Sequence, residues 1–178
     1  MTSDVTPQRE PRYCHQCGGA LRLQRVPGDE RERLVCQTCA FIHYENPRVV
    51  ASVLPERDEG GARLVLLMRR AMEPRRGFWT PPGGFVELGE SPEEAAVREG
   101  AEEVALTLEP FALLGVYSRP ALGIVVVAYR ARALETEPQP GIEALEARWF
   151  AADEIPWDEL AFETTTRALR DWLAAIER

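Results

Sequence analysis

Runs of apolar residues recur along the chain, and glycine, proline and charged residues separate them. Leucine and β-branched residues dominate these runs, and each run is five to eight residues long, as expected for buried β-strands. A proline-containing stretch without periodicity predicts a loop at residues 135–141. The predicted strands cover residues 49–54, 63–70, 112–117 and 124–131, with a shorter candidate at residues 146–150.

Two segments have helical patterns. In residues 91–104, Ser91 takes the cap position, Pro92 follows at the first helical position, and Glu94 completes a capping box. Residues 164–176 place their large apolar side chains on one helical face. The order of strands and helices predicts a mixed α/β fold.

The composition suits one globular domain with a small appendage. The chain has 178 residues, of which 45% are hydrophobic and 28% are charged. Residues 1–11 have no periodicity and predict a loose tail. No segment reaches the roughly 20 apolar residues that span a bilayer, and the first residues lack the apolar core of a secretory signal. We therefore expect a soluble, cytoplasmic protein that does not bind membranes.

Charge and residue types narrow the chemistry. All 21 basic residues are arginine, and 29 acidic residues give a net charge of −8, so a broad attraction to nucleic acid is not expected. The absence of lysine excludes Schiff-base chemistry and a lysine-dependent phosphate loop. All four cysteines lie in one early cluster, which excludes a cysteine nucleophile elsewhere. Carboxylates, and a metal that they hold, remain as the expected reactive groups.

The cysteine cluster predicts a structural zinc site in residues 12–45. Two C-x-x-C pairs are separated by eighteen residues, a spacing at which two turns present four thiolates to one tetrahedral zinc ion. Four thiolates leave no position for water, so the zinc is expected to be structural. His15 and His43 lie nearby and are not expected to be ligands. The predicted zinc ligands are Cys14, Cys17, Cys36 and Cys39.

Zinc ribbons often bind nucleic acid, but the net charge of this module does not favour that function. Six arginines and four acidic residues between positions 9 and 33 give +2, and a zinc ion with four thiolates contributes about −2. A nearly neutral module is a poor electrostatic match for DNA or RNA. We expect it to stabilise the protein or to contribute to a dimer.

Residues 79–106 contain the strongest functional signal. Two prolines and two glycines at positions 81–84 predict a tight turn that permits close approach of a ligand or metal to the backbone. The three glutamates Glu99, Glu102 and Glu103 then share one helical face. Six acids and one arginine from position 90 to 103 give a local charge of −5. Such a set of oxygen ligands fits Mg²⁺ or Mn²⁺ in phosphate chemistry.

This segment resembles the Nudix box of the Nudix hydrolases. Two positions depart from that pattern: Gly100 stands where an apolar residue is usual, and Ala105 stands where a glycine is usual. Gly100 inside a helix costs about 1 kcal/mol relative to alanine. The identities, in order and spacing, are Gly84, Glu90, Arg98, Glu99, Glu102 and Glu103.

The cysteine cluster is followed by HYENPRVV, then by EPRRGFWTPPGG and later by PGIEALEARWFAADEIPWDELAF. With these segments, roughly residues 13–165 resemble zinc-ribbon Nudix enzymes, including FAD and ADP-ribose pyrophosphatases. The resemblance implies a Nudix fold at residues 46–178, with a mixed sheet between helices. It also implies metal-dependent cleavage of a pyrophosphate bond in a nucleoside diphosphate linked to another moiety, with release of a nucleoside monophosphate. The SQPWPFP segment of NADH pyrophosphatases is absent, and this region reads GVYSRPALG. This absence argues against a nicotinamide dinucleotide; FAD or ADP-ribose is the favoured substrate, with NADH or a dinucleoside polyphosphate as the alternative.

The resemblance also implies residue roles. Glu99, Glu102 and Glu103 are the expected catalytic metal ligands, and Gly84 offers its carbonyl group. Arg98 is expected to orient a carboxylate, and Glu90 to assist a metal-bound water.

Other features were less specific. Candidates for the general base are the box glutamates and the loop acids Glu143 and Glu146. Phe78, Trp79 and Tyr117 could stack on a base, although aromatic residues in such contexts are more often core residues. A non-catalytic nucleotide- or RNA-binding protein is the alternative class, but the box acids are retained. Nudix enzymes of this kind are often dimers, so a homodimer is expected.

Overall fold

The computed structural model describes residues 11–135 and 137–177. The predicted tail at residues 1–11 lies almost entirely outside this part of the chain. The chain divides into two compact units, one ending at Asn46 and one beginning at Pro47. None of the helices in the described ranges is long and apolar enough to cross a bilayer.

The first unit is a small antiparallel sheet around the cysteines. Its strands are β1 (Leu21–Arg25), β2 (Glu32–Cys36) and β3 (Ile42–His43), arranged in the order β1-β2-β3. Cys14, Leu21 and Cys36 form its buried centre. Sequence periodicity does not predict these strands, because they are short, have exposed faces and show no clear apolar alternation.

The second unit is built on a mixed seven-stranded sheet. Its central path runs β10-β5-β4-β9-β8, with β6 beside β5 and β7 beside β4. The pairing of β4 with β9 is parallel, and the other pairings are antiparallel. The bounds are β4 Arg48–Glu59, β5 Ala62–Arg70, β6 Trp79–Thr80, β7 Gly83–Phe85, β8 Leu108–Arg119, β9 Ile124–Ala133 and β10 Ala144–Phe150.

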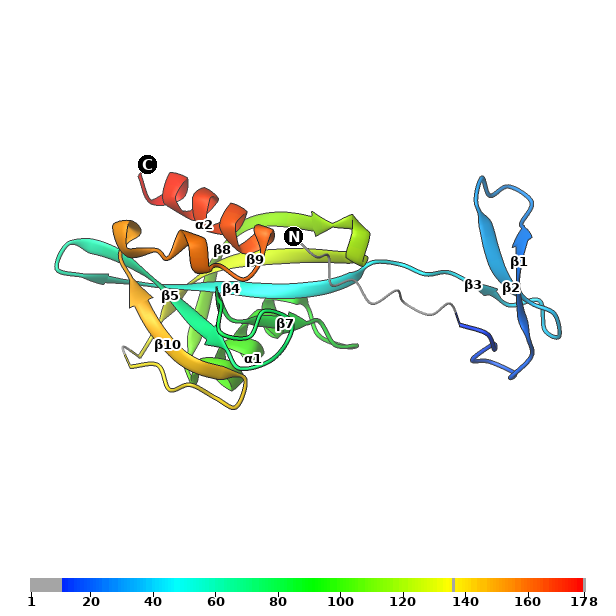
Figure 1. The fold of residues 1–178 in the computed structure, drawn as a ribbon, viewed down its shortest axis with the longest axis horizontal. Coiled ribbons are helices and arrows are strands. Elements are labelled where there is room, and N and C mark those ends of the chain that lie inside the picture. The colour runs from blue at the N-terminus through cyan, green and yellow to red at the C-terminus, as the bar shows by residue number, and fades with distance from the viewer. Residues whose placement is uncertain (1–10, 136, 178) are drawn as a thin grey trace. The chain divides into compact units, whose positions relative to one another are not determined.

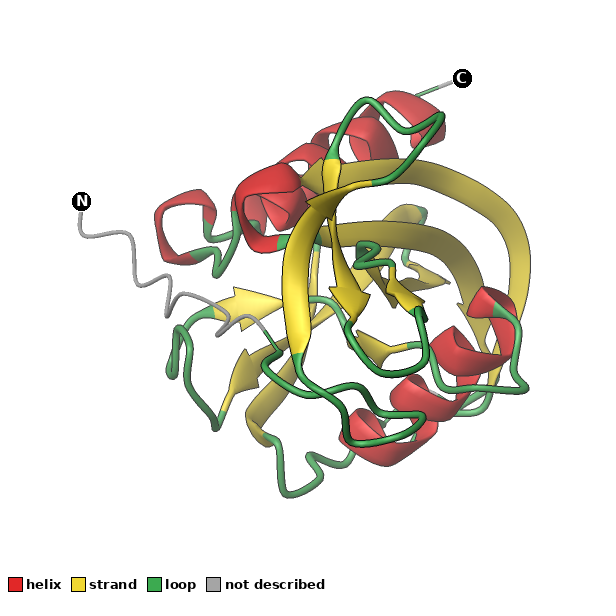
Figure 2. Ribbon diagram, turned by 90° about the vertical axis from the view of Figure 1, so that its right-hand side faces the viewer, coloured by secondary structure: helices red, strands yellow, loops and turns green. Residues whose placement is uncertain are grey.

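Two helices cover opposite sides of this sheet (Figure 1). Helix α1 (Pro92–Val104) packs on a core that includes Val53 and Leu66, and α2 (Glu163–Ile176) packs on a core that includes Leu54 and Trp172. Because neighbouring strand residues point to opposite faces, Val53 and Leu54 serve different cores. Figure 2 shows the strongly curved sheet with helices on both sides. The predicted mixed α/β fold is confirmed.

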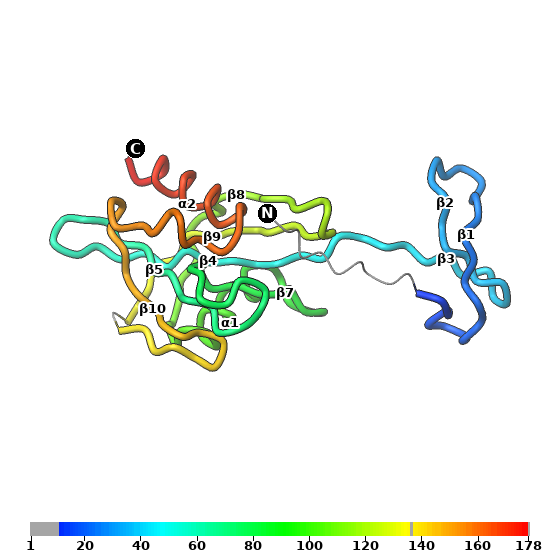
Figure 3. Tube along the Cα trace, in the orientation of Figure 1, coloured from blue at the N-terminus to red at the C-terminus, as the bar shows by residue number. Residues whose placement is uncertain are grey.

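The predicted strands are all present, and several are longer than their apolar runs. Strand β4 continues to Glu59 and β8 begins at Leu108, because hairpin pairing with β5 and β9 supplies backbone hydrogen bonds to their polar ends. Figure 3 follows the chain through the β4–β5 hairpin. Strands β6 and β7 are too short to predict from periodicity. Three 3₁₀ turns complete the described elements: Pro120–Leu122, Ala152–Glu154 and Trp157–Glu159.

Candidate functional site

The glycine turn brings the sheet against the acidic face of α1. Gly83 and Gly84 lie on β7 opposite Ser52 and Ala51 of β4. A Cβ atom on Gly83 would lie 2.5 Å from the carbonyl oxygen of Ala51, and one on Gly84 would overlap the carboxylate of Glu99. Backbone atoms of β4 leave room only for glycine at position 83, and the lack of a side chain at position 84 lets the turn lie directly beside the Glu99 carboxylate.

The start of α1 is fixed by its predicted cap. The side chain of Ser91 accepts a hydrogen bond from the Glu94 amide at 3.2 Å, and the Ser91 amide donates to the Glu94 carboxylate at 2.7 Å. Pro92 is the first helical residue. This reciprocal cap fixes where the helix begins, and therefore which side chains face the turn.

Arg98 is the centre of a hydrogen-bonded network of acids. Its Nη1 donates to Glu99 at 2.8 Å and to Glu102 at 3.2 Å, while its Nε and Nη2 donate to Glu90 at 3.1 and 2.8 Å. Nη2 also donates to the Phe85 carbonyl at 3.2 Å. These bonds lower the pKa of the Glu90 carboxyl and raise that of Arg98. Arg98 thus holds three acids in fixed positions.

Glu103 is the buried acid of the site, with a relative exposure of 4%. One carboxylate oxygen accepts a hydrogen bond from the Gly83 amide at 2.8 Å. Burial, with smaller contributions from Glu99 and Glu143, raises the pKa of Glu103 to about 8. Burial likewise raises the pKa of Glu99 against the opposing effect of Arg98. The site therefore concentrates more negative charge than Arg98 neutralises, and a bound cation would relieve this.

The structure separates the two candidate bases that lie outside the box. Glu143 follows two residues after Gly141, whose amide donates to the Glu103 carbonyl at 2.8 Å, and it lies near enough to raise the pKa values of Glu99 and Glu103 slightly. Glu146 instead lies on β10, in register with Arg69 of β5. The loop that precedes β10 carries Glu143 toward the acidic site. Glu146 lies three residues later, on β10 itself.

The two departures from the box have different consequences. The side chain of Leu108 fills the space beside Gly100, so the missing apolar side chain on α1 is replaced from β8. Ala105 ends α1 in the left-handed conformation, with φ 53° and ψ 39°, and its amide donates to Ala101. An alanine here adopts the geometry that glycine usually supplies, at a cost in backbone strain.

A narrow pocket of about 70 Å³ lies beside the glycine turn. The ring of Phe162 lies on its wall, with the guanidinium groups of Arg70 and Arg119 centred 5.3 and 5.2 Å from the ring centroid. Arg70 also contributes electrostatically to Glu103, so it links the pocket with the acidic site. The lining includes Val50, Ser52, Thr80, Gly83, Val126 and Thr165.

The aromatic candidates from the sequence lie elsewhere. Trp79 is buried against Phe150, and Tyr117 is buried and donates to Asp171 at 2.7 Å, so both are core residues. Phe78 lies under the guanidinium of Arg75. Sequence reasoning missed Phe162 and Arg70, because no local pattern shows that the start of α2 meets the end of β5.

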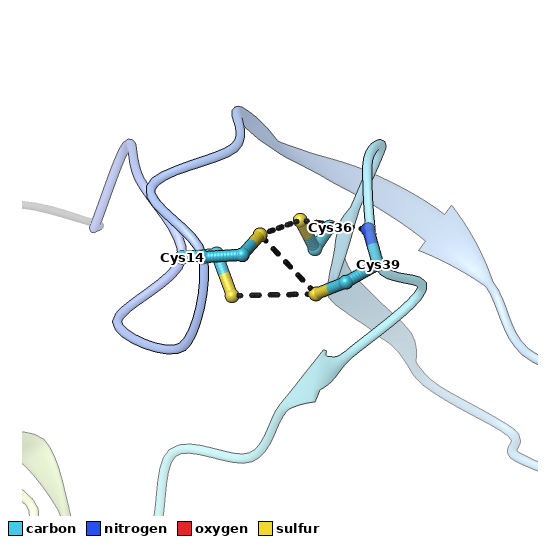
Figure 4. Close-up of side chains that lie close together, drawn as sticks. Cys14, Cys36 and Cys39 are labelled. Atoms are coloured by element: carbon cyan, nitrogen blue, oxygen red, sulfur yellow. Dashed lines mark hydrogen bonds between the residues drawn. The ribbon is translucent and has the colours of Figure 1, made fainter.

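The four cysteine sulfurs gather at one point of the first unit. All four Sγ atoms lie within 4.8 Å of one another, and three of the Sγ–Sγ distances are 3.3, 3.5 and 3.8 Å. A tetrahedron with Zn–S bonds of about 2.3 Å has edges of about 3.8 Å. Figure 4 shows Cys14, Cys36 and Cys39 close together. Amides of Cys39 and Thr38 donate to the Cys36 sulfur and lower the pKa of its thiol to about 6. The cluster therefore fits a metal that binds thiolates.

Other ligand groups near the cysteines or on α1 are less closely gathered. His15 packs edge-on against Phe41 at 4.8 Å and is not part of the sulfur cluster. Among the described residues, the box glutamates do not form a group as tight as the cysteines. Mutual repulsion keeps their carboxylates apart, and Arg98 bridges Glu99 and Glu102.

Comparison with known proteins follows the same division of the chain. The NUDIX domain family matches residues 46–173, and the Nudix N-terminal zinc-ribbon family matches residues 12–45. An ADP-ribose pyrophosphatase of Methanocaldococcus jannaschii is 36% identical over 124 residues, which are 67% of this chain and 70% of that protein. The NAD-capped RNA hydrolase NudC of Deinococcus radiodurans is 29% identical over 95% of this chain, but the match spans only 59% of NudC.

Solved structures show the same architecture. A Nudix hydrolase from Nitrosomonas europaea aligns with a TM-score of 0.86 and 39% identity, covering 92% of this chain and 91% of that one. The Nudix domain of Shewanella oneidensis NrtR, solved with ADP-ribose, shares the fold with a TM-score of 0.63 at 24% identity, over 75% of this chain and 90% of that one. The chain therefore belongs to the Nudix family of pyrophosphohydrolases and joins its fold to an N-terminal zinc-ribbon module.

Proposed function

We propose that the chain cleaves the pyrophosphate bond of a nucleoside diphosphate linked to another moiety, with ADP-ribose or FAD as the favoured substrate, and releases a nucleoside monophosphate. The observation that carries this proposal is the group of acids at the glycine turn. Glu103 is buried against the Gly83 amide, and Glu99 and Glu102 share the guanidinium of Arg98. These contacts support the assignment of the box acids to one site.

The donor set fits Mg²⁺ or Mn²⁺. Hard divalent cations prefer carboxylate and carbonyl oxygens, and burial, with smaller contributions from neighbouring acids, raises the pKa values of Glu99 and Glu103. Glu99, Glu102, Glu103 and the carbonyl group of Gly84 are the proposed ligands. When bound, such a cation neutralises charge that develops on the phosphate oxygens and promotes deprotonation of water.

Arg98 and Glu90 support these ligands. Arg98 holds Glu99 and Glu102 through Nη1, and Glu90 fixes the other side of the guanidinium through two hydrogen bonds. Because both carboxylates bond to the Arg98 guanidinium, their rotation is restricted and their oxygens keep one orientation. We assign Arg98 to carboxylate orientation, and Glu90 to holding Arg98 and to assisting a bound water.

Glu143 is the proposed general base. It is exposed, it contributes to the raised pKa values of Glu99 and Glu103, and it lies on the loop that bonds to the end of α1. In this role its carboxylate accepts a proton from the water whose oxygen attacks phosphorus, while the bridging oxygen leaves with the second phosphate. Glu146 has no comparable position.

The organic part of the nucleotide has a candidate position in the pocket beside the turn. Phe162 offers a ring for stacking, and Arg70 lies over this ring and also contributes to the electrostatics of Glu103. A substrate that spans both places would set its phosphates near Arg70 and its base near Phe162. The pocket has apolar walls and hydroxyl groups, as is usual for nucleotide sites.

A second candidate substrate follows from the relatives named NAD-capped RNA hydrolase NudC. An RNA joined to a nicotinamide dinucleotide presents the same pyrophosphate bond. The net charge of −8 favours a small nucleotide over RNA. Binding of single-stranded RNA in a salt titration discriminates between the two, because RNA contact through phosphates weakens steeply with salt.

The zinc ribbon and the oligomeric state complete the proposal. Zn²⁺ bound by Cys14, Cys17, Cys36 and Cys39 would hold the first unit together, since that unit has only a very small core. Reduced thiolates of this kind fit a cytoplasmic location. We also propose a homodimer: the edge strand β8 exposes Phe111, Leu113 and Val116. Light scattering would give the mass of the assembly.

The activity is tested by product analysis with liquid chromatography and mass spectrometry. The protein is incubated with FAD, ADP-ribose, NADH and diadenosine polyphosphates, with and without Mg²⁺ or Mn²⁺. We expect AMP from ADP-ribose or FAD only when the metal is present. If no substrate yields a nucleoside monophosphate with either Mg²⁺ or Mn²⁺, the proposal is contradicted.

A further inference from the structure

The loop before β10 closes over the last turn of α1. The amide of Gln139 donates to the carbonyl of Val104 at 2.9 Å, and the amide of Gly141 donates to the carbonyl of Glu103 at 2.8 Å. The last carbonyl groups of a helix have no partners within the helix, so these two bonds come from outside. The loop is therefore attached to the turn of α1 that bears Glu102 and Glu103.

The same loop is attached to the sheet two residues later. The carbonyl of Glu143 accepts a hydrogen bond from the Ala71 amide, just after β5, at 2.8 Å, and the Ala144 amide donates to Gly141 at 3.2 Å. Pro138 and Pro140 restrict the preceding backbone. Residues 139–144 thus bridge α1 and β5, and Glu143 lies on this bridge. Figure 3 shows the loop beside α1 in yellow.

Gly141 is required by space, not by backbone conformation. Its φ lies outside the left-handed region, unlike that of eight other glycines of the chain. A Cβ atom at position 141 would overlap the carbonyl oxygen of Glu102 and lie 3.3 Å from that of Glu103. Both obstacles are backbone atoms of α1, which cannot move aside without displacing the helix.

We propose that Gly141 is a positioning residue: its lack of a side chain lets the loop pass the Glu102 carbonyl and bond to the backbone of Glu103 and Val104, and this contact sets Glu143 beside the acidic site. The inference rests on the proposed function of that site. The loop that carries the proton acceptor and the helix that carries the metal-binding acids would then be joined by backbone hydrogen bonds, so that their relative positions are fixed. Displacement by about 1 Å in such an arrangement costs about 100-fold in rate.

The test compares wild type with Gly141→Ala, Glu143→Gln and the double variant, using kcat and KM for ADP-ribose with saturating Mg²⁺. We expect Gly141→Ala to lower kcat by about 10- to 100-fold with KM within about threefold. Because Gly141 acts through Glu143, adding Gly141→Ala to Glu143→Gln should cost less than about threefold. Equal fold losses in the two backgrounds, or an unchanged kcat in Gly141→Ala, would overturn the proposal.

A matched control separates positioning from lost stability. A Cβ atom on Gly115 of β8 would lie 2.7 Å from the hydroxyl of Tyr117, so Gly115→Ala is also crowded but lies outside the site. It should keep the wild-type kcat at a temperature where both variants are folded. A loss of kcat in Gly115→Ala equal to that in Gly141→Ala would assign the effect to general destabilisation and overturn the proposal.

Amide hydrogen exchange tests the bridge independently of catalysis. In Gly141→Ala we expect faster exchange at Gln139 and Ala71 while the interior of α1 keeps its protection. Unchanged exchange at both amides would overturn the proposed bridge, even if the wild type proves active. If the wild type hydrolyses nothing, the proposed function fails, and the exchange measurement alone still decides whether Gly141 anchors the loop.

Discussion

The side chain of Leu108 occupies the space beside α1 that a side chain at Gly100 would fill. A residue at the first position of β8 therefore replaces an apolar side chain that the box usually supplies from the helix itself. Leu108 has an exposure of 4% and belongs to the core under α1. The glycine on the helix and the leucine on the strand form one complementary contact.

This contact predicts the effect of restoring a side chain. Gly100→Ala should gain about 1 kcal/mol of helix propensity, but the methyl group overlaps Leu108, and crowding in a packed core costs about 1 to 3 kcal/mol. We expect no net gain, or a loss of up to about 2 kcal/mol, by chemical denaturation. Relative to Leu108→Ala alone, Gly100→Ala should stabilise, and a destabilising effect in that background would contradict the complementarity.

Substitution of Ala105 by glycine is expected to increase stability, the opposite of the effect expected at Gly100. Because its left-handed conformation is strained for alanine, Ala105→Gly should raise the free energy of unfolding by about 0.5 to 1 kcal/mol. Ala101→Gly within the same helix is the control, and should lower that free energy by about 1 kcal/mol. If both substitutions destabilise the chain equally in the same denaturation assay, the strain at Ala105 is refuted.

The pKa of Glu103 predicts how stability depends on pH when no divalent cation is bound. Burial raises this pKa in the folded protein from 4.5 to about 8, so the neutral form is favoured by folding. The stabilising contribution is complete below the unfolded pKa and is lost as the pH rises through about 8. Wild type should lose on the order of 1 to 3 kcal/mol between pH 5.5 and 9 from this group.

Glu103→Gln removes that titration and keeps an oxygen for the Gly83 amide. In buffer without added Mg²⁺ or Mn²⁺, its unfolding free energy should fall less than that of wild type over the same pH range. Glu146→Gln, an exposed strand substitution, should follow wild type. Parallel curves for wild type and Glu103→Gln would show that the carboxylate is not perturbed in the folded chain.

The position of Phe162 on the wall of the pocket predicts that its substitution weakens substrate binding. Loss of base stacking should raise the KM of Phe162→Ala for ADP-ribose about 5- to 50-fold with a small change in kcat. Phe111→Ala is the matched control, because that ring also lies under an arginine, Arg130, but on an exposed part of β8. Steady-state kinetics with unchanged KM in Phe162→Ala would remove the pocket from substrate binding.

The sequence predicted the parts of the molecule that local pattern determines. Helix α1 begins at Pro92 and ends at Val104, as expected from its capping box and periodicity, and the five apolar runs all became strands. The cysteines also meet as their spacing predicted. These features depend on side chains close together in the chain, so one sequence contains the needed information.

The rest depends on contacts between distant segments. Glu143 and Glu146 looked equivalent as acids three residues apart, and only the bonds from the loop to α1 and β5 distinguish them. No local pattern relates Phe162 to Arg70, and only the fold brings both to one pocket beside the glycine turn. The replacement of a side chain at Gly100 by Leu108 is likewise visible only in three dimensions.

The central claim is that the acidic face of α1 performs metal-dependent pyrophosphate hydrolysis. It is tested most directly by the initial rate of AMP release from ADP-ribose in Mg²⁺, compared among wild type, Glu102→Gln and Glu146→Gln. Glu102 is exposed, so its substitution should leave the fold intact. We predict that Glu102→Gln loses about 100-fold or more while Glu146→Gln keeps the wild-type rate. Equal rates in wild type and Glu102→Gln would contradict the account.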